Sequence, residues 1–287
     1  MKTIYKRELR SYFANNTAFV VIAALIFFIG IFFNIINMRG GNSIFGYTID
    51  SASISLIFVI PILTMKSFAG EKKENTDKLL FSLPIRTKSI VLGKFLSLIT
   101  VYAIGILIVC LFPVIIGFFG NINYIAAYSS ILAYFLLGIA LISICMFISS
   151  HTENEMISAV ISIAVLFMIY LFKSFSVMIP KTALASYIAA LVVTVALGFG
   201  IYKLLKDYLF SLSFTLIFIV AETVLYIFNK SIYEKLFPNI FTKLALFDRL
   251  ADFTYGFINI GAYLIFISVT VIFVYLSYLS VENRRRG

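Results

Sequence analysis

The amino-acid sequence predicts an all-α integral membrane protein with about eight transmembrane helices. Of its 287 residues, 62% are hydrophobic and only 13% are charged, whereas soluble domains have roughly 45–50% and 25%. The apolar residues form runs of about 20, the length that a helix needs to cross a bilayer. The formal charge of +10 comes from basic residues scattered beside these runs, which indicates a topology signal and not nucleic-acid binding.

Residues 1–16 have the pattern of an amphipathic helix that lies in the membrane surface. One side of the helical wheel is apolar and the other is basic; these sides carry Ile4, Tyr5, Leu9, Tyr12 and Phe13, and Lys6, Arg7 and Arg10. Such a helix binds the inner headgroup layer, where each basic residue gains about 1 kcal/mol from anionic lipid. A plain topological anchor fits the pattern equally well and predicts the same location.

Eight apolar runs follow, each long enough to cross the membrane as a helix. Pro61 falls inside the second run and is expected to kink it, because its ring removes one backbone hydrogen bond. Residues 120–123 have the composition of a tight turn and are expected to join the third and fourth runs. The eight runs cover residues 17–37, 51–69, 95–119, 124–149, 156–179, 183–202, 209–228 and 257–280.

The distribution of basic residues predicts which loops lie inside the cell. With both termini on one side of the membrane, that side receives sixteen of the 23 lysines and arginines and the opposite side receives six. The positive-inside rule therefore places both termini and residues 71–88 in the cytoplasm. Residues 229–256, broken at Pro238, then form an extracellular segment.

Residues 71–88 separate the second and third spans and predict a short cytoplasmic helix. Asp77 suits the positive end of the helix dipole, and Pro84 ends the helix. A charge run alone is typical of a solvated loop, but this segment also carries a stripe at helical spacing, formed by Thr76, Leu79, Leu80 and Leu83. A solvated loop has no need of an apolar stripe, so the segment predicts a docking surface for the membrane or another protein.

Six stretches of the chain carry a family resemblance, and they are Pro61–Met65, Glu71–Lys73, Thr76–Leu80, Leu92–Phe95, Phe147–Glu155 and residues 247–286. In this order and spacing they resemble the permease subunits of type-2 ABC exporters, and most closely the branch of gliding-motility and copper or nitrous-oxide-maturation permeases. In that family the segment between the second and third spans is a coupling helix that docks on a separate ATPase. The helix pair of residues 183–228 departs from the six-span core of many relatives.

The resemblance implies a transport subunit of the bacterial cytoplasmic membrane and not an enzyme. It implies that a partner ATPase binds ATP and Mg²⁺, that a second copy or a related permease completes the transport route, and that an accessory membrane subunit with an extracytoplasmic domain can join the complex. The residues expected to dock the ATPase are Glu71, Lys72, Thr76, Asp77, Leu79, Leu80, Leu83 and Pro84. The second cytoplasmic turn contributes His151, Glu153 and Glu155.

The sequence predicts no catalytic, metal or nucleotide site in this chain. His151 is the only histidine, so neither a His-rich metal site nor a Ser-His-Asp triad can be assembled. Gly93 and Lys94 are followed by Phe95, where a phosphate-binding loop needs Ser or Thr to hold magnesium.

Lys173 and Glu222 are the two charges expected within spans. An ionisable group at this depth costs several kcal/mol unless it is paired or hydrated. We interpret the two as an ion pair that holds the helices of residues 183–228 to the bundle, with a proton or substrate relay as the alternative. An ATP-independent secondary transporter or channel, which is the alternative function, would use such an intramembrane site.

Overall fold

The computed structural model describes residues 1–74, 76, 85–178, 184, 186–188, 190–191, 194–195, 208–228, 245–256 and 259–286. The described residues form helices and turns, and no strand occurs among them. The chain divides into two compact units, one of residues 1–170 and 246–287 and the other of residues 171–245.

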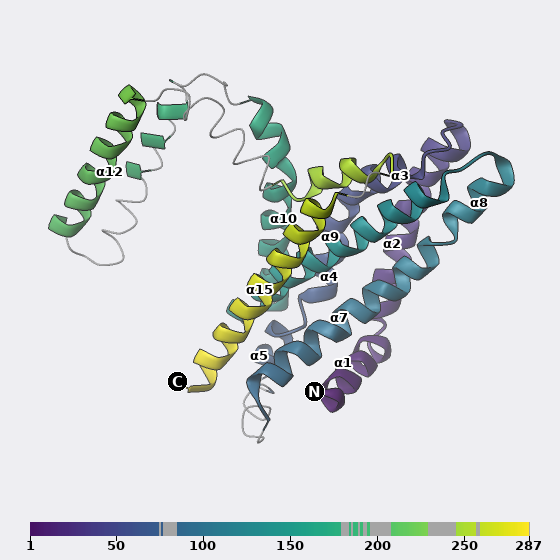
Figure 1. The fold of residues 1–287 in the computed structure, drawn as a ribbon. Coiled ribbons are helices and arrows are strands. Elements are labelled where there is room, and N and C mark those ends of the chain that lie inside the picture. The colour runs from purple at the N-terminus through teal and green to yellow at the C-terminus, as the bar shows by residue number, and fades with distance from the viewer. Residues whose placement is uncertain are drawn as a thin grey trace. The chain divides into compact units, whose positions relative to one another are not determined.

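The larger unit holds most of the helices (Figure 1). In chain order they are α1 (Lys2–Ala14), α2 (Thr17–Phe33), the π-helix η1 (Asn34–Arg39), α3 (Phe45–Ala52), the 3₁₀ turn η2 (Ser53–Ser55), α4 (Leu56–Thr64), α5 (Ala69–Lys73), α7 (Thr87–Val109), α8 (Phe112–Phe119), α9 (Tyr124–His151), the first part of α10 (Glu155–Met178), the 3₁₀ helix η3 (Phe247–Phe253) and α15 (Ile260–Arg286). The smaller unit contains the end of α10 and α12 (Tyr208–Phe228).

Six stretches of the described residues are long and apolar enough to cross a membrane, which confirms the predicted all-α membrane protein. They are Thr17–Arg39, Phe45–Lys73, Thr87–Phe119, Tyr124–His151, Glu155–Phe172 and Ile260–Arg285, and each coincides with a predicted span. Of the other two predicted spans, residues 183–202 lie mostly outside the described residues. Residues 209–228 coincide with helix α12.

Two spans begin earlier than the apolar runs predict. The second starts at Phe45 instead of Ser51, and the third starts at Thr87 instead of Phe95. Both extensions contain polar residues that hydropathy places outside the membrane. The structure buries Thr48 and Lys94 completely and gives each a partner, because Thr48 donates a hydrogen bond to Asn37 and Lys94 forms ion pairs.

Helix α9 is the centre of the larger unit. Helices α3, α4, α7 and α15 and the 3₁₀ helix η3 all pack on it. In its most apolar 18-residue stretch 72% is buried, whereas in that of Thr17–Arg39 only 22% is buried. Tyr102 of α7 lies so close to Gly138 of α9 that an added Cβ would be 2.3 Å from the ring. The Tyr102 hydroxyl donates to the backbone carbonyl of Tyr134 at 3.0 Å. The close contact between α7 and α9 therefore depends on Gly138.

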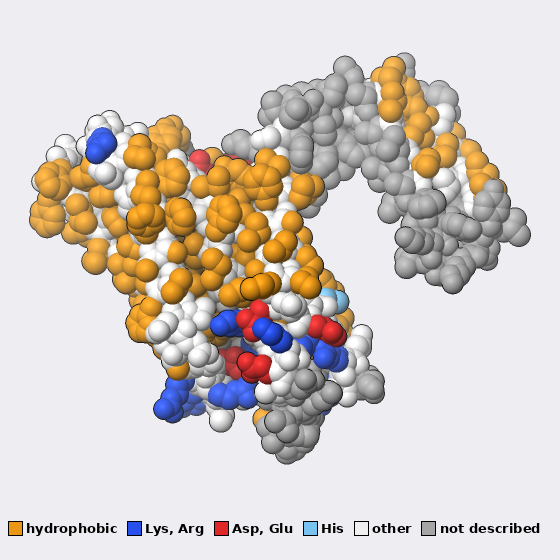
Figure 2. Space-filling view, turned by 180° about the vertical axis from the view of Figure 1, so that it is seen from behind, with side chains coloured by type: hydrophobic (Ala, Val, Ile, Leu, Met, Phe, Trp, Pro, Cys, Tyr) orange, Lys and Arg blue, Asp and Glu red, His pale blue; other side chains and the backbone are white. Residues whose placement is uncertain are grey.

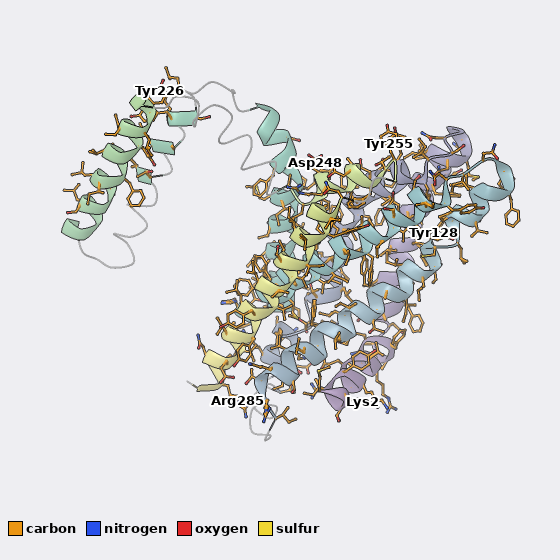
Figure 3. All side chains as sticks on the ribbon, viewed as in Figure 1. Lys2, Tyr128, Tyr226, Asp248, Tyr255 and Arg285 are labelled. Carbon is orange, nitrogen blue, oxygen red and sulfur yellow. The ribbon has the colours of Figure 1, made fainter. Side chains whose placement is uncertain are left out.

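Charged side chains gather at one end of the larger unit, below a broad band of hydrophobic side chains (Figure 2). Lys2 and Arg285 lie at this end, whereas Tyr128 and Tyr255 lie at the opposite end (Figure 3). Both chain termini thus share one end. It consists of α1, α5, the first eight residues of α7, the last turn of α9 and the last turn of α15, and it is termed the basic end.

The opposite end of the larger unit is closed by η3 and the turn that follows it. The Ser130 hydroxyl of α9 donates to the backbone carbonyl of Phe253 at 2.9 Å. An added Cβ at Gly46 of α3 would come within 2.6 Å of the Thr254 Cα. Residues 246–256 of the predicted extracellular segment are therefore packed against the helical bundle, while residues 229–244 lie outside the described residues.

Candidate functional site

Lys94 is the centre of an ion-pair network at the basic end. Its ammonium lies 3.1 Å from Glu8 Oε2 of α1 and 2.9 Å from Glu71 Oε1 of α5. Arg7 contacts the same two carboxylates from the solvent side, at 2.6 Å from Glu8 and 2.8 Å from Glu71. Two cations thus balance two carboxylates, which is the condition under which buried charges are tolerated. The network joins α1, α5 and α7.

The orientation of α1 explains why a carboxylate reaches Lys94. Ile4, Glu8 and Tyr12 are the buried residues of α1, and their spacing of four puts them on one face of the helix. Ile4 packs so closely on Gly93 of α7 that an added Cβ there would lie 3.1 Å from its side chain. The next turn of α1 then brings Glu8 to Lys94, which follows Gly93 in α7.

The network also determines how Glu8 titrates. Burial by itself raises the pKa of the Glu8 carboxyl, but attraction to Lys94 and Arg7 outweighs this effect and lowers the pKa below its ordinary value of 4.5. A carboxyl with a depressed pKa in the folded state contributes stability above its unfolded pKa. The stability that Glu8 contributes is therefore lost progressively as the pH falls below 4.5 and passes through the lowered pKa of the folded state.

Helix α9 holds the segment that leads into α5. The Ser149 hydroxyl accepts hydrogen bonds from the backbone N–H groups of Phe68 at 3.2 Å and Ala69 at 3.1 Å, which are among the N–H groups left unpaired at a helix start. It also donates to the backbone carbonyl of Met65 at 3.3 Å. The Lys72 ammonium donates to the carbonyl of Ser150, so α5 is attached to the end of α9 at both of its ends.

Helix α15 holds the point where the chain returns from residues 71–88 to the bundle. Arg285 Nη1 donates to the backbone carbonyl of Ile85 at 2.6 Å and lies 3.3 Å from the Thr87 hydroxyl oxygen. The Lys88 ammonium stands 5.5 Å from the centre of the Tyr278 ring. Both ends of the predicted coupling segment are therefore fixed to the helical bundle.

The structure describes only some of the predicted docking residues. Glu71 lies in the ion-pair network, Lys72 binds the α9 backbone, and the exposed Thr76 donates to the carbonyl of Glu71 at 3.3 Å. Asp77, Leu79, Leu80, Leu83 and Pro84 lie outside the described residues. The apolar stripe of the coupling helix therefore stays a prediction.

The predicted second cytoplasmic turn lies beside α5. His151 is exposed, and its ring packs edge-on against Phe147 at 4.6 Å. Glu153 is exposed as well, whereas Glu155 begins α10 with its carboxylate 3.3 Å from the place of a Cβ at Gly70. The fold thus brings together residues 69–76 and 150–155, two segments that lie at least 74 positions apart in the sequence.

Glu222 lies in the smaller unit, on α12, and accepts a hydrogen bond from the Thr194 hydroxyl at 2.5 Å. The side chain of Lys173 lies outside the described residues, so the predicted Lys173–Glu222 pair stays a prediction. The hydroxyl supplies a hydrogen-bond donor to one oxygen of the Glu222 carboxylate.

Sequence reasoning missed several residues that organise the basic end, and they are Arg7, Glu8, Lys94, Ser149 and Arg285. One signal was present, because Glu8 is the only acidic residue before Asp50 and stands in an otherwise basic helix. A lone carboxylate among cations in an amphipathic helix indicates a specific partner. No comparable signal marks Ser149, whose hydrogen bonds depend on a contact across 80 residues.

Comparison with protein families shows to which family the chain belongs. The family described as ABC-2 family transporter protein matches residues 4–284, a range that includes most of α1, all of α5, α7 and α9, and α15 up to Arg284. The comparison with curated proteins gave no match. The chain therefore belongs to the ABC-2 family and is a multi-pass membrane permease subunit of an ABC transporter.

Proposed function

We propose that this chain is the membrane subunit of an ATP-driven exporter and that its basic end receives a separate ATPase. Family membership implies association with ABC ATPase partners. The observation that carries the rest is the attachment of residues 71–88 at both ends. Ion pairs and hydrogen bonds link their start to α1, α7 and α9, and Arg285 of α15 links their end.

This attachment suits an element that transmits movement. A segment tied to the bundle at one point would move without shifting the helices, whereas this one is tied to four of them. Binding of ATP and Mg²⁺ would be supplied by the partner. The contribution of this chain is to pass the displacement of residues 71–88 through Glu71 to Lys94 and hence to α1 and α7.

The finer features of the proposal follow from the sequence. They are eight spans, a coupling helix within residues 71–88, a basic end that faces the bacterial cytoplasm, and a second permease copy or related permease beside this one. The positive-inside rule supports the orientation, because thirteen of the sixteen basic residues assigned to the cytoplasm are described residues in or next to the helix ends that form the basic end. The stretches quoted above support the gliding-motility and copper or nitrous-oxide-maturation branch.

The docking proposal predicts that Leu80→Asp abolishes ATPase binding. A helix that inserts leucines into a partner groove loses its anchor when one of them becomes charged. The permease should still be inserted, because Leu80 belongs to the polar segment between two spans. The measurement is recovery of the ATPase in a pull-down from membranes, normalised to permease abundance.

Lys73→Ala provides the matched control for this test. Lys73 is exposed in α5, and removal of an exposed charge at an interface rim changes affinity little. We expect nearly full ATPase recovery with this variant. Full recovery with Leu80→Asp as well would show that residues 71–88 do not form the joint.

The orientation predicts which introduced cysteines react from outside intact cells. In a background without Cys110 and Cys145, cysteines in place of Ser43 and Asn123 should be labelled by a membrane-impermeant maleimide, since both residues are exposed at the end opposite to the basic end. A cysteine in place of the exposed Thr76 should react only after the cells are opened. Labelling of position 76 in intact cells would reverse the topology.

A further inference from the structure

A groove runs between the start of α7 and the middle of α15, and its volume is about 380 Å³. Apolar side chains line its length, among them Val91, Leu92 and Phe95 of α7 and Val271, Val274 and Tyr275 of α15. Leu92 is 41% exposed and Val271 62% exposed. The groove is therefore open at the surface of the larger unit, and both of its walls belong to helices long and apolar enough to cross a membrane.

The dimensions of the groove match part of one lipid leaflet. Its lining extends from Lys88 to Phe95 in α7, which is about 10 Å of helix. One leaflet contributes roughly 15 Å of hydrocarbon to the bilayer. Thr270 does not need a hydrogen-bond partner in the groove, because its hydroxyl donates to the carbonyl of Phe266 in its own helix at 2.8 Å. The groove thus offers an apolar channel about 10 Å long, which can hold part of one acyl chain.

A cation stands at the end of this channel that lies nearest the basic end. The exposed Lys88 lines the groove, and its ammonium lies 5.5 Å from the centre of the Tyr278 ring. A cation–π contact positions the ammonium without occupying an oxygen acceptor, so its three N–H donors can point to the headgroup layer. An apolar channel that ends at a cation is complementary to a ligand with a hydrocarbon chain and an anionic head.

We propose that this groove binds one anionic phospholipid of the leaflet at the basic end, with an acyl chain between α7 and α15 and its phosphate at Lys88. A second copy of the chain fits less well, because an apolar helix across the groove would remove the Lys88 ammonium from water without a counter-charge. The site adjoins Thr87 and Arg285, where residues 71–88 rejoin the bundle. The lipid would thus contact α7 at its first turn.

The proposal can be tested by fluorescence quenching, because the chain contains no tryptophan. Leu92→Trp places a single indole in the groove of the full-length permease in mixed-lipid nanodiscs. The probes are phosphatidylglycerol and phosphatidylcholine, each brominated on one acyl chain. We expect phosphatidylglycerol to reach half-maximal quenching at an about fivefold lower mole fraction, the factor expected for one basic residue and an anionic lipid. Lys88→Gln in the same background should remove this preference.

Val160→Trp is the matched control. Val160 is the sixth residue of α10 and is 65% exposed, just as Leu92 is the sixth residue of α7, but it does not line the groove. Lys88→Gln should leave its quenching by both lipids unchanged. If Leu92→Trp fails to fold, Val271→Trp on the opposite wall carries the same expectation.

Three results would overturn the proposal. Equal quenching by the two lipids in the groove would show that the site has no anionic preference. A preference that survives Lys88→Gln would show that this lysine does not hold the head. If neither lipid quenches the groove tryptophan while both quench Val160→Trp, a protein partner covers the groove.

Discussion

Lys94→Met is expected to destabilise the permease by about 3 kcal/mol, because removal of one member of a buried ion-pair network leaves its partners uncompensated. The lysine is 1% exposed and contacts both Glu8 and Glu71. Methionine has a similar length but no charge, so the change removes the ion pairs with little loss of packing. For a chain of this size the unfolding midpoint should fall by about 6–12 °C. Thermal unfolding of the purified permease in detergent measures the effect.

Lys6→Met is the control for the loss of a lysine by itself. Lys6 lies on the exposed side of α1, and substitution of such a residue changes stability by about 0.5 kcal/mol or less. Glu8→Gln combined with Lys94→Met should recover part of the loss, because Arg7 then faces a single carboxylate. Equal midpoints for Lys94→Met and Lys6→Met would mean that the network contributes nothing to folding.

The pH provides a second readout of the same network. Because the folded-state pKa of Glu8 is lowered below 4.5, the wild type should exceed Glu8→Gln in stability at neutral pH. The difference should shrink as the pH falls below 4.5, where protonation of Glu8 removes the charge that Gln already lacks. A difference that stays constant down to pH 3 would contradict the ion-pair geometry.

Gly138→Ala is expected to cost about 1–3 kcal/mol, the usual penalty for overpacking a filled core. The added methyl carbon would lie 2.3 Å from Tyr102 Cζ, closer than any non-bonded contact permits. Tyr102 is 1% exposed and stacks on Phe135 at 5.8 Å, so its ring has no space into which to move. Helices α7 and α9 must then separate, and the unfolding midpoint should drop accordingly.

Gly30→Ala is the matched control, since both glycines lie inside transmembrane helices. No atom lies within 4 Å of an added Cβ at Gly30, and alanine favours a helix over glycine by up to about 1 kcal/mol. This variant should be as stable as the wild type or more so. In a Tyr102→Leu background the shorter side chain should reduce the cost of Gly138→Ala. An unchanged cost there would show that the clash with the tyrosine ring is not the cause.

The other contacts of the basic end, like those of Lys94 and Gly138, depend on residues from different helices. Its polar contacts lie between elements that are far apart in the chain: Arg7 with Glu71, Ala69 with Ser149, and Thr87 with Arg285. Each contact is modest singly, but together they fix the two described ends of residues 71–88 to four helices. The proposed lipid at Lys88 would add a further contact at the same place.

The sequence by itself determined the class of the protein and most of its spans. Long apolar runs have few alternatives to a transmembrane helix, because backbone polar groups in lipid must be paired within the segment. The amphipathic character of residues 1–16 likewise predicted α1, and the charge distribution predicted that both termini share one end. These features depend on local composition, which a sequence records directly.

Only the tertiary structure decided where the polar residues of the spans belong. Hydropathy excluded Lys94 and Thr48 from the spans, because each is unfavourable in lipid when considered alone. Their partners, Glu8 and Asn37, come from other helices, and pairing reverses the energetic preference. The apolar periodicity of α1 also concealed Glu8 on its buried face. Such residues cannot be assigned from composition, since burial of a charge depends on what another part of the chain places beside it.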